Sequence, residues 1–146
     1  MRSIHSNLVF LAATVLLAVP ACSRQPVYPA PLIVGRDAVI DTATLKPDVP
    51  QFFTYQYQGR NISFFVINMD GRIVSFFDAC ASCYKHKQGY RSEESGVTCR
   101  YCGTTFPIYK LEKGLGGCYP IKVEGRIADG KYRIPIASLE AEAGKF

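Results

Sequence analysis

The clearest chemistry in this sequence is carried by four cysteines in one short stretch. Two C-x-x-C pairs, separated by 15 residues, consist of Cys80, Cys83, Cys99 and Cys102. Two residues between cysteines let both sulfurs of a tight turn point at one centre, and two such turns supply a tetrahedral set of four thiolates. The spacing is typical of zinc sites, and cysteine quartets also hold iron–sulfur clusters, so it predicts a metal or cluster site on these residues.

The sequence argues against some other uses of cysteine pairs and leaves others open. A c-type haem site needs a histidine directly after the pair, whereas Tyr84 and Gly103 follow here. A thioredoxin-like site has one pair at a helix start in a βαβ unit, a pattern this chain does not show. A thiol–disulfide protein remains an alternative, as does a zinc-ribbon-like binding module in which zinc only holds the loops together.

Two further residues near the pairs have side chains that bind metals in other proteins. Cys118 follows two glycines, and three roles are open for it: a further cofactor ligand, a redox-active neighbour or a simple buried thiol. His86 stands between two lysines, where a histidine is more often solvated than bound to metal. Beyond Cys22 the chain has five cysteines, an odd number that cannot all pair internally.

The N-terminal residues predict export and a lipid anchor. Residues 1–21 read as a signal peptide, with Arg2 followed by an apolar run over residues 8–19. Twelve helical residues span roughly 18 Å, against roughly 30 Å of hydrocarbon core, so the run is too short for a permanent membrane span. The stretch VPAC resembles a bacterial lipoprotein signal with Cys22 as the lipidated residue, and an ordinary secretory signal is the alternative. We therefore expect an extracytoplasmic lipoprotein on the periplasmic side of a membrane.

Proline content indicates a tether before the folded domain, and net charge limits the kind of partner. Residues 22–33 are proline-rich and predict an extended tether. The leader holds one basic residue and no acid, so the net charge of +5 becomes +4 after its removal. This mild excess suits an acidic protein or an anionic surface, and it falls short of the basic face that nucleic-acid binding needs.

Residues 34–146 read as one all-β domain, a small antiparallel sandwich or barrel with the cysteines on an insert between strands. Aromatic and β-branched runs alternate with turn residues such as Asp70-Gly71, and no βαβ pattern occurs. The predicted strands cover residues 51–57, 61–68, 72–77, 106–111, 121–127 and 131–136, and a helix capped by Ser138 is predicted over 138–143. The first three strands form a meander that ends near Cys80. No catalytic triad, carboxylate dyad or phosphate loop is evident, so a carrier is expected rather than an enzyme.

The sequence around the cysteines resembles the FtrD-like family of membrane-associated, iron-sulfur-containing proteins, which is linked in part to bacterial ferrous-iron uptake. The likeness covers about residues 34–137. It rests on the motifs DACASCY (78–84), GY (89–90), VTCRYCG (97–103), Phe106 and GGCYP (116–120). It implies a metal or iron–sulfur site on the paired cysteines and Cys118. With such a site, we expect electron transfer with a redox or transport protein of the membrane.

A more distant likeness is to the second half of a Rieske domain, in which a β framework holds a [2Fe–2S] cluster between two loops. Cys83 and Cys102 stand near the places of the two Rieske histidines, so a cluster here would have four thiolate ligands and a lower potential. Zinc or a single iron is the alternative cofactor. Thiolates take either ion directly from solution, which is the simpler route for a chain exported unfolded.

Overall fold

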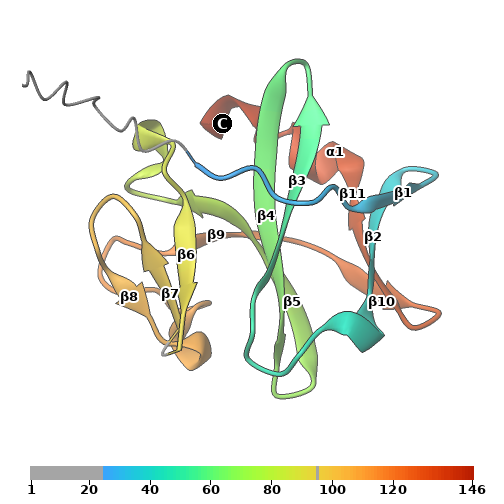
Figure 1. Ribbon diagram of the computed structural model, residues 1–146, viewed down its shortest axis with the longest axis horizontal. Coiled ribbons are helices and arrows are strands. Elements are labelled where there is room, and N and C mark those ends of the chain that lie inside the picture. Colours follow the sequence, from blue (N-terminus) through green and yellow to red (C-terminus); the bar gives the residue numbers. More distant parts are fainter. Residues whose placement is uncertain (1–24, 95) are drawn as a thin grey trace, which may run out of the picture.

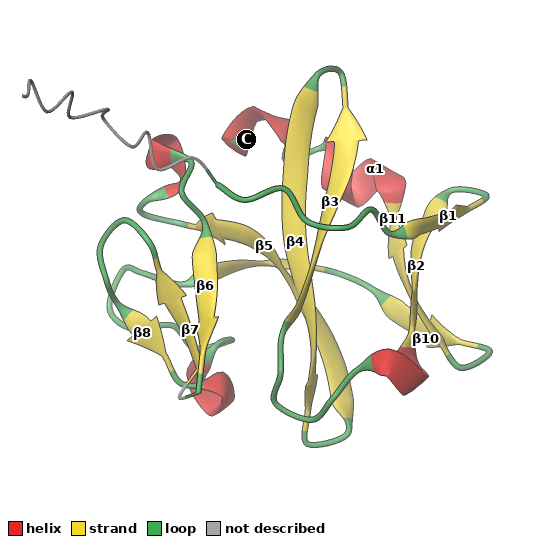
Figure 2. Ribbon diagram, viewed as in Figure 1, coloured by secondary structure: helices red, strands yellow, loops and turns green. Residues whose placement is uncertain are grey.

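Three antiparallel β-sheets form the framework of the described chain (Figure 1). The computed structural model describes residues 25–94 and 96–146, and the predicted signal peptide and lipidation site Cys22 lie outside these residues. Within the described residues, helix is limited to α1 (Ile136–Glu140) and four 3₁₀ turns (Figure 2). These turns are η1 (Thr42–Thr44), η2 (Tyr84–His86), η3 (Ile108–Lys110) and η4 (Ala143–Lys145). The predicted all-β antiparallel fold class is confirmed.

The central sheet has the order β3-β4-β5-β9 and contains the predicted meander. Its strands are β3 (Gln51–Tyr57), β4 (Arg60–Met69), β5 (Arg72–Cys80) and β9 (Pro120–Val123). The turn at Asp70-Gly71 joins β4 to β5 with both residues at positive φ, as its sequence predicts. Strand β5 continues three residues beyond the predicted end at Phe77, so its last residue is Cys80.

A second sheet, of order β1-β2-β11-β10, packs against one face of the central sheet (Figure 1). Its strands are β1 (Leu32–Val34), β2 (Asp37–Asp41), β11 (Lys131–Pro135) and β10 (Arg126–Ala128). The single strand predicted over 121–127 is wrong, because β9 and β10 belong to different sheets. Between them lies Gly125, where a Cβ atom would be 2.5 Å from the Tyr132 ring, so the chain passes that ring closely as it changes sheet.

The third sheet, of order β6-β7-β8, lies at the opposite side of the central sheet (Figure 1). It consists of β6 (Tyr90–Glu93), β7 (Gly96–Cys99) and β8 (Thr105–Phe106). The strand predicted over 106–111 is wrong beyond Phe106, because Pro107 has no N–H to continue the ladder and η3 follows it. At Gly96 a Cβ atom would lie 2.0 Å from the Phe106 carbonyl oxygen, so only glycine allows β7 to approach β8 this closely.

The central sheet is buried on both faces, which gives the molecule two hydrophobic cores. Successive side chains of a strand point to opposite faces, so Phe64 and Val66 enter one core while Phe65 and Ile67 enter the other. Each fully buried ring or branched chain stabilises the fold by about 1.5–3 kcal/mol. Cys80, Cys83 and Cys99 belong to the second core, between the central sheet and the third sheet. The predicted cysteine insert is therefore packed into the body of the protein.

The described part of the proline-rich segment runs along the body in an extended conformation. The Tyr28 N–H donates to Thr54 Oγ1 at 2.9 Å, and the Thr54 N–H donates to the Pro29 carbonyl at 3.1 Å. The Tyr28 ring stacks on Phe52 with centroids 4.8 Å apart. From Gln25 onward this segment is thus attached to the central sheet, and β1 begins within it.

The C-terminal helix differs from its prediction. Helix α1 begins after Pro135, and Ser138 lies inside the helix instead of capping it. Pro135 ends β11 with φ −58°, and the Ile136 N–H donates to the Arg36 carbonyl at 2.9 Å, which fixes the start two residues earlier.

Candidate metal centre

Each C-x-x-C pair forms a tight turn at the end of a strand, as predicted. In the first turn the Cys83 N–H donates to the Cys80 carbonyl at 3.0 Å, and η2 begins directly after it. In the second, Cys99 ends β7, and the Gly103 N–H donates to the Cys99 carbonyl at 2.9 Å. Gly103 has φ +73°, so its left-handed backbone closes this turn around the sulfurs.

The loop that carries Cys118 is attached to the first turn by two hydrogen bonds. The Ala81 N–H donates to the Tyr119 carbonyl at 3.0 Å, and Ser82 Oγ donates to the Gly117 carbonyl at 2.6 Å. These bonds flank Cys118 on both sides along the chain. They explain how a cysteine 16 residues beyond Cys102 reaches the same place.

The structure brings all five cysteine sulfurs together in two overlapping groups of three. Within each group the sulfur atoms lie within 4.8 Å of one another. One group is Cys80, Cys83 and Cys99, and the other is Cys83, Cys102 and Cys118. The arrangement is thus two triads that share Cys83, whereas the spacing predicted one quartet and the family resemblance added Cys118. All five are free thiols.

The spacing and chemistry of these sulfurs fit a metal centre. A metal–sulfur distance of about 2.3 Å in a tetrahedron places neighbouring sulfurs about 3.8 Å apart, so thiols within 4.8 Å need to move little to bind one ion. Soft thiolate ligands select iron–sulfur clusters, zinc and copper(I). Cys80, Cys83 and Cys99 are buried, Cys118 is half-buried and Cys102 is exposed. The centre therefore has one side in the core and one side open to solvent.

The electrostatics of the cluster favour a cation. Burial raises the pKa of Cys83, and the neighbouring Cys102, Cys80 and Cys99 sulfurs raise it further. Burial likewise raises the pKa of Cys99. Burial also opposes ionisation of Cys80, but polar groups around the sulfur, first among them the Ser82 backbone N–H, outweigh it and lower the pKa of Cys80. A bound cation would remove the repulsion between thiolates, which couples metal binding to their deprotonation.

A ring stack connects the two cysteine turns. The His86 ring, three residues after Cys83, lies on the Tyr101 ring with centroids 3.5 Å apart and planes 7° from parallel. Tyr101 stands between Cys99 and Cys102, so the stack holds η2 against the second turn. His86 belongs to neither sulfur group, and its stack with Tyr101 supports the site.

Beneath the sulfurs lies a buried polar network that sequence reasoning missed. The carboxylate of Asp78, 1% exposed, accepts hydrogen bonds from the Tyr90 N–H at 2.5 Å and from Gln25 Nε2 at 2.7 Å. Gln25 Nε2 also donates to the Asp78 carbonyl oxygen at 2.7 Å. Sequence carries no signal for a contact between residues 53 positions apart. This hydrogen-bond network holds the end of β5, and with it Cys80, against β6.

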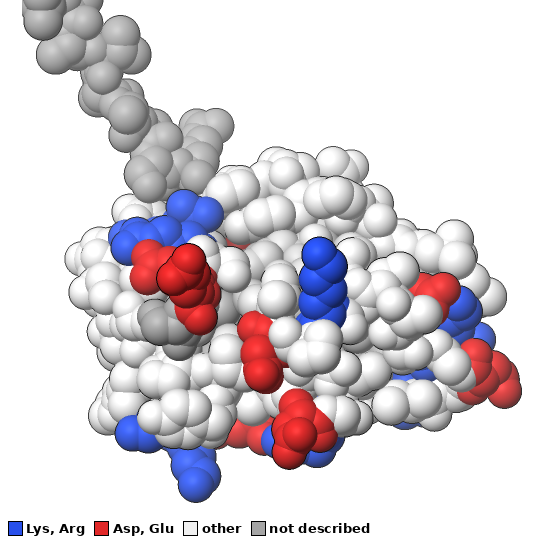
Figure 3. Space-filling model, turned by 60° about the horizontal axis from the view of Figure 1, so that its bottom comes forward, with Lys and Arg blue, Asp and Glu red and all other residues white. Residues whose placement is uncertain are grey.

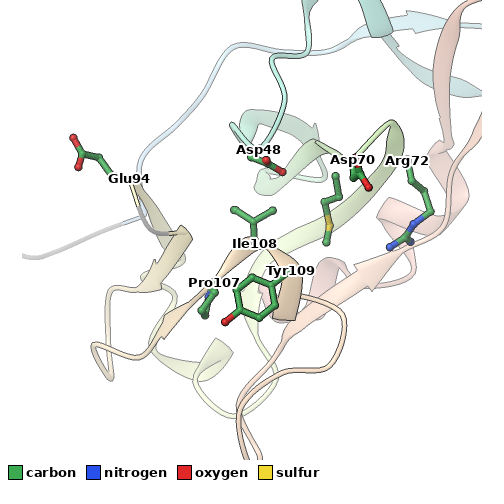
Figure 4. A pocket seen from close by; sticks show the side chains of 8 residues that line it. Asp48, Asp70, Arg72, Glu94, Pro107, Ile108 and Tyr109 are labelled. Atoms are coloured by element: carbon green, nitrogen blue, oxygen red, sulfur yellow. The ribbon is translucent and has the colours of Figure 1, made fainter.

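A hollow elsewhere on the surface is unrelated to the thiols. It has a volume of about 630 Å³, and no cysteine lines it. In Figure 4 its carboxylates, on Asp48, Asp70 and Glu94, lie apart around the rim and do not converge on a point. We therefore place the candidate site at the cysteines.

The fold and site define a small antiparallel β protein with a cysteine centre suited to a metal or cluster. The family model described as membrane iron-sulfur containing protein FtrD-like matches residues 45–146, and the chain belongs to this family. The family resemblance in the sequence is thereby confirmed. No curated protein and no solved structure gives a significant match to the chain. Within residues 25–94 and 96–146, no helix is both long and apolar enough to cross a membrane.

The shared position of Cys83 predicts unequal effects of single cysteine replacements. Cys83→Ser removes a member of both sulfur groups, so we expect metal content to fall below about a tenth of the wild-type value. Cys118→Ser leaves Cys80, Cys83, Cys99 and Cys102 in place, and we expect it to retain most of the metal. Elemental analysis of the purified proteins measures both, and equal losses would contradict the shared role of Cys83.

The buried carboxyl of Asp78 predicts a pH-dependent stability. Burial raises the pKa of Asp78 from 3.8 to about 6, despite the hydrogen bonds from Gln25 and Tyr90. Because the pKa is raised in the folded state, the stability from this group is fully present below pH 3.8 and is lost as the pH rises through about 6. The loss is on the order of 3 kcal/mol.

We expect Asp78→Asn to flatten this dependence in the metal-free protein, whereas Asp129→Asn, at an exposed turn, leaves it unchanged. Urea unfolding between pH 3.5 and 7, in steps of about half a unit, gives the free energy of unfolding at each pH. An Asp78→Asn curve that still falls by the wild-type amount would show that other groups cause the dependence.

Proposed function

We propose that the protein is a lipid-anchored, extracytoplasmic iron–sulfur protein that passes electrons to or from a membrane protein, in the service of iron uptake. The observation that carries the proposal is the convergence of five thiols, three of them buried, in a chain of an iron-sulfur-containing family. When bound, the cluster supplies a site that gains and loses single electrons. The chain's own residues then determine where it is held and from which side it is reached.

The proposed ligands are the two C-x-x-C pairs, with Cys118 as a fifth sulfur at the edge. Backbone hydrogen bonds to Cys80 come from Ser82 and Cys83, and those to Cys99 come from Tyr101 and Cys102. Such bonds stabilise the ionised thiols and tune the potential of a bound centre. Tyr90 and Phe106 close the core side against water with fully buried rings.

The open side of the centre supports electron transfer with a protein partner. Cys102 is exposed, and the Tyr101 and Tyr119 rings beside the site are 50% and 47% exposed. A partner that docks on this side comes within contact of a ligand sulfur.

The proposed lipid anchor would hold this centre close to the membrane. Cys22 lies three residues before Gln25, and three residues span at most about 11 Å. The Gln25 N–H donates to the Lys87 carbonyl at 3.3 Å, and its side chain binds Asp78 beside Cys80. Acyl chains on Cys22 would thus keep the site within reach of a redox or transport protein in the same membrane.

The charge distribution supports docking by short-range contacts more than by a broad electrostatic field. Basic and acidic side chains are interspersed on the face in Figure 3, with uncharged surface between them. Of the basic residues near the cysteines, Arg91 pairs with Glu93 and Arg100 Nε donates to the Tyr90 carbonyl at 2.9 Å. Lys87 Nζ donates to the Phe146 carbonyl at 3.0 Å. These internal contacts leave less basic surface to attract an acidic partner, and they do not support nucleic acid as the ligand.

A single zinc or iron ion is the second candidate for the centre. The observation that favours it is the close spacing of the sulfurs, because groups within 4.8 Å match neighbouring ligands of one tetrahedral ion. With zinc the protein would be a binding module without redox activity.

The cofactor proposal predicts a coloured protein after anaerobic purification. We expect iron and acid-labile sulfide, with visible absorbance that decreases on addition of dithionite, because the sulfide-to-iron charge-transfer bands depend on the oxidation state. Iron without sulfide would indicate a single-iron site. Colourless protein that contains zinc alone would refute the proposal and support the binding module.

The anchor proposal predicts that Cys22 determines membrane association. In a bacterial host, we expect the wild-type protein to incorporate labelled palmitate and to sediment with membranes. Cys22→Ser should lose the label and appear in the soluble extracytoplasmic fraction, whereas Cys118→Ser, a matched control, should stay with the membranes. Sedimentation of Cys22→Ser at the wild-type level would rule out a lipid on this residue as the anchor.

A further inference from the structure

Tyr90 has a hydroxyl group without a partner in the core beside the thiols. Its side chain is fully buried, and its Oη forms no hydrogen bond with any described residue. It is the first residue of β6, directly opposite Cys99 in the β6–β7 register. Among the buried side-chain oxygens and nitrogens of residues 25–94 and 96–146, it is the single one in this condition.

A buried hydroxyl without a partner is costly, so its presence calls for an explanation. Leaving such a group unsatisfied costs about 1–3 kcal/mol. The Tyr90 ring packs edge-on against Phe65 and Phe106, with centroids 6.1 Å and 5.9 Å away. A phenylalanine would make the same ring contacts without this cost. Packing therefore accounts for the ring and leaves the hydroxyl unexplained.

Cysteine sulfurs are the groups of this core that can accept a hydrogen bond from the hydroxyl. Tyr90 lies in the same buried cluster as Cys80, Cys83 and Cys99, and the other buried members of the cluster are aromatic or aliphatic. Cys80 is two residues beyond Asp78 on β5, and the Tyr90 N–H binds the Asp78 carboxylate, so Tyr90 packs beside Cys80. A tyrosine hydroxyl is a donor at neutral pH, and an ionised, metal-bound sulfur is a stronger acceptor than the free thiol, with which the hydroxyl forms no hydrogen bond.

The backbone around Tyr90 keeps the hydroxyl in this place. The Tyr90 N–H donates to Asp78 Oδ1 at 2.5 Å, and its carbonyl accepts from Arg100 Nε at 2.9 Å. Asp78 is held in turn by Gln25. At Gly89 a Cβ atom would lie 2.5 Å from Asp78 Oδ2, so a larger residue would displace the carboxylate that anchors Tyr90. These bonds fix the Tyr90 backbone beside the end of β5, where Cys80 lies.

We propose that the Tyr90 hydroxyl donates a hydrogen bond to the Cys80 sulfur of the loaded centre and thereby raises its reduction potential. The proposal rests on the proposed function, because it requires a redox-active centre at these cysteines. Reduction adds negative charge to the centre and its sulfurs, and a donor stabilises the more negative state more strongly. Tyr90 thus acts through Cys80 as a positioning residue that sets the potential.

The test compares the reduction potentials of anaerobically purified wild-type protein and Tyr90→Phe by equilibrium redox titration. We expect Tyr90→Phe to load the same amount of iron and to have a more negative potential. Loss of one donor lowers the equilibrium constant for reduction by up to about tenfold, which is about 59 mV for one electron. In the metal-free state the variant should be at least as stable as the wild type, because it loses only an unpartnered hydroxyl.

The matched control is Tyr132→Phe, which removes a buried hydroxyl from the other core. There the Tyr132 hydroxyl lies 3.0 Å from Ser75 Oγ, so its removal breaks a hydrogen bond far from the sulfurs. We expect Tyr132→Phe to lower stability and to leave the potential unchanged. A merely structural role for Tyr90 would give its variant this same pattern.

The outcomes separate this inference from the proposed function. An unchanged potential in a loaded Tyr90→Phe protein overturns the inference and leaves the iron–sulfur proposal standing. Wild-type protein without a redox-active centre overturns both. If Tyr90→Phe does not load, difluorotyrosine at position 90 tests the same bond, since its more acidic hydroxyl should shift the potential in the positive direction. No shift with difluorotyrosine would also overturn the inference.

Discussion

The fold holds five cysteine sulfurs so close together that they would repel one another if they were all ionised. Two groups of three sulfurs, each within 4.8 Å, share Cys83, and burial with mutual repulsion raises the pKa of that central thiol. The free energy that holds them there comes from the two cores of the central sheet and from backbone hydrogen bonds across the turns. A cation at this point converts the repulsion into attraction, so the same geometry that is unfavourable for thiolates alone is favourable for a metal centre.

Different elements of the fold position different cysteines. Strand β5 of the central sheet ends at Cys80, and β7 of the third sheet ends at Cys99, so that the two sulfurs lie within 4.8 Å of each other. The stack of His86 on Tyr101 joins the two turns, while hydrogen bonds from Ala81 and Ser82 bring in the Cys118 loop. Asp78 and Gln25 tie the N-terminal segment to the same place. A lipid on Cys22 would consequently hold the centre near the membrane, because Gln25 follows Cys22 by three positions.

Sequence reasoning succeeded where a local pattern determines the structure. Alternating aromatic and β-branched residues with an Asp-Gly turn predicted the meander, because side-chain period and turn chemistry are both local. The C-x-x-C spacing likewise predicted the two turns. It failed where a distant contact decides, because Gly125 between β9 and β10 passes the Tyr132 ring closely as the chain changes sheet. It also extended one strand past Pro107, whose missing N–H is a local signal within an otherwise apolar run. The membership of Cys118 in a sulfur group and the pairing of Gln25 with Asp78 arise from the tertiary fold, so spacing alone does not reveal them.

The most direct test of the account is iron X-ray absorption spectroscopy of the loaded wild-type protein. The account predicts a first coordination shell made only of sulfur and a short iron–iron distance from a cluster. A shell of nitrogen or oxygen, or iron that is absent while zinc occupies the sulfurs, would contradict it.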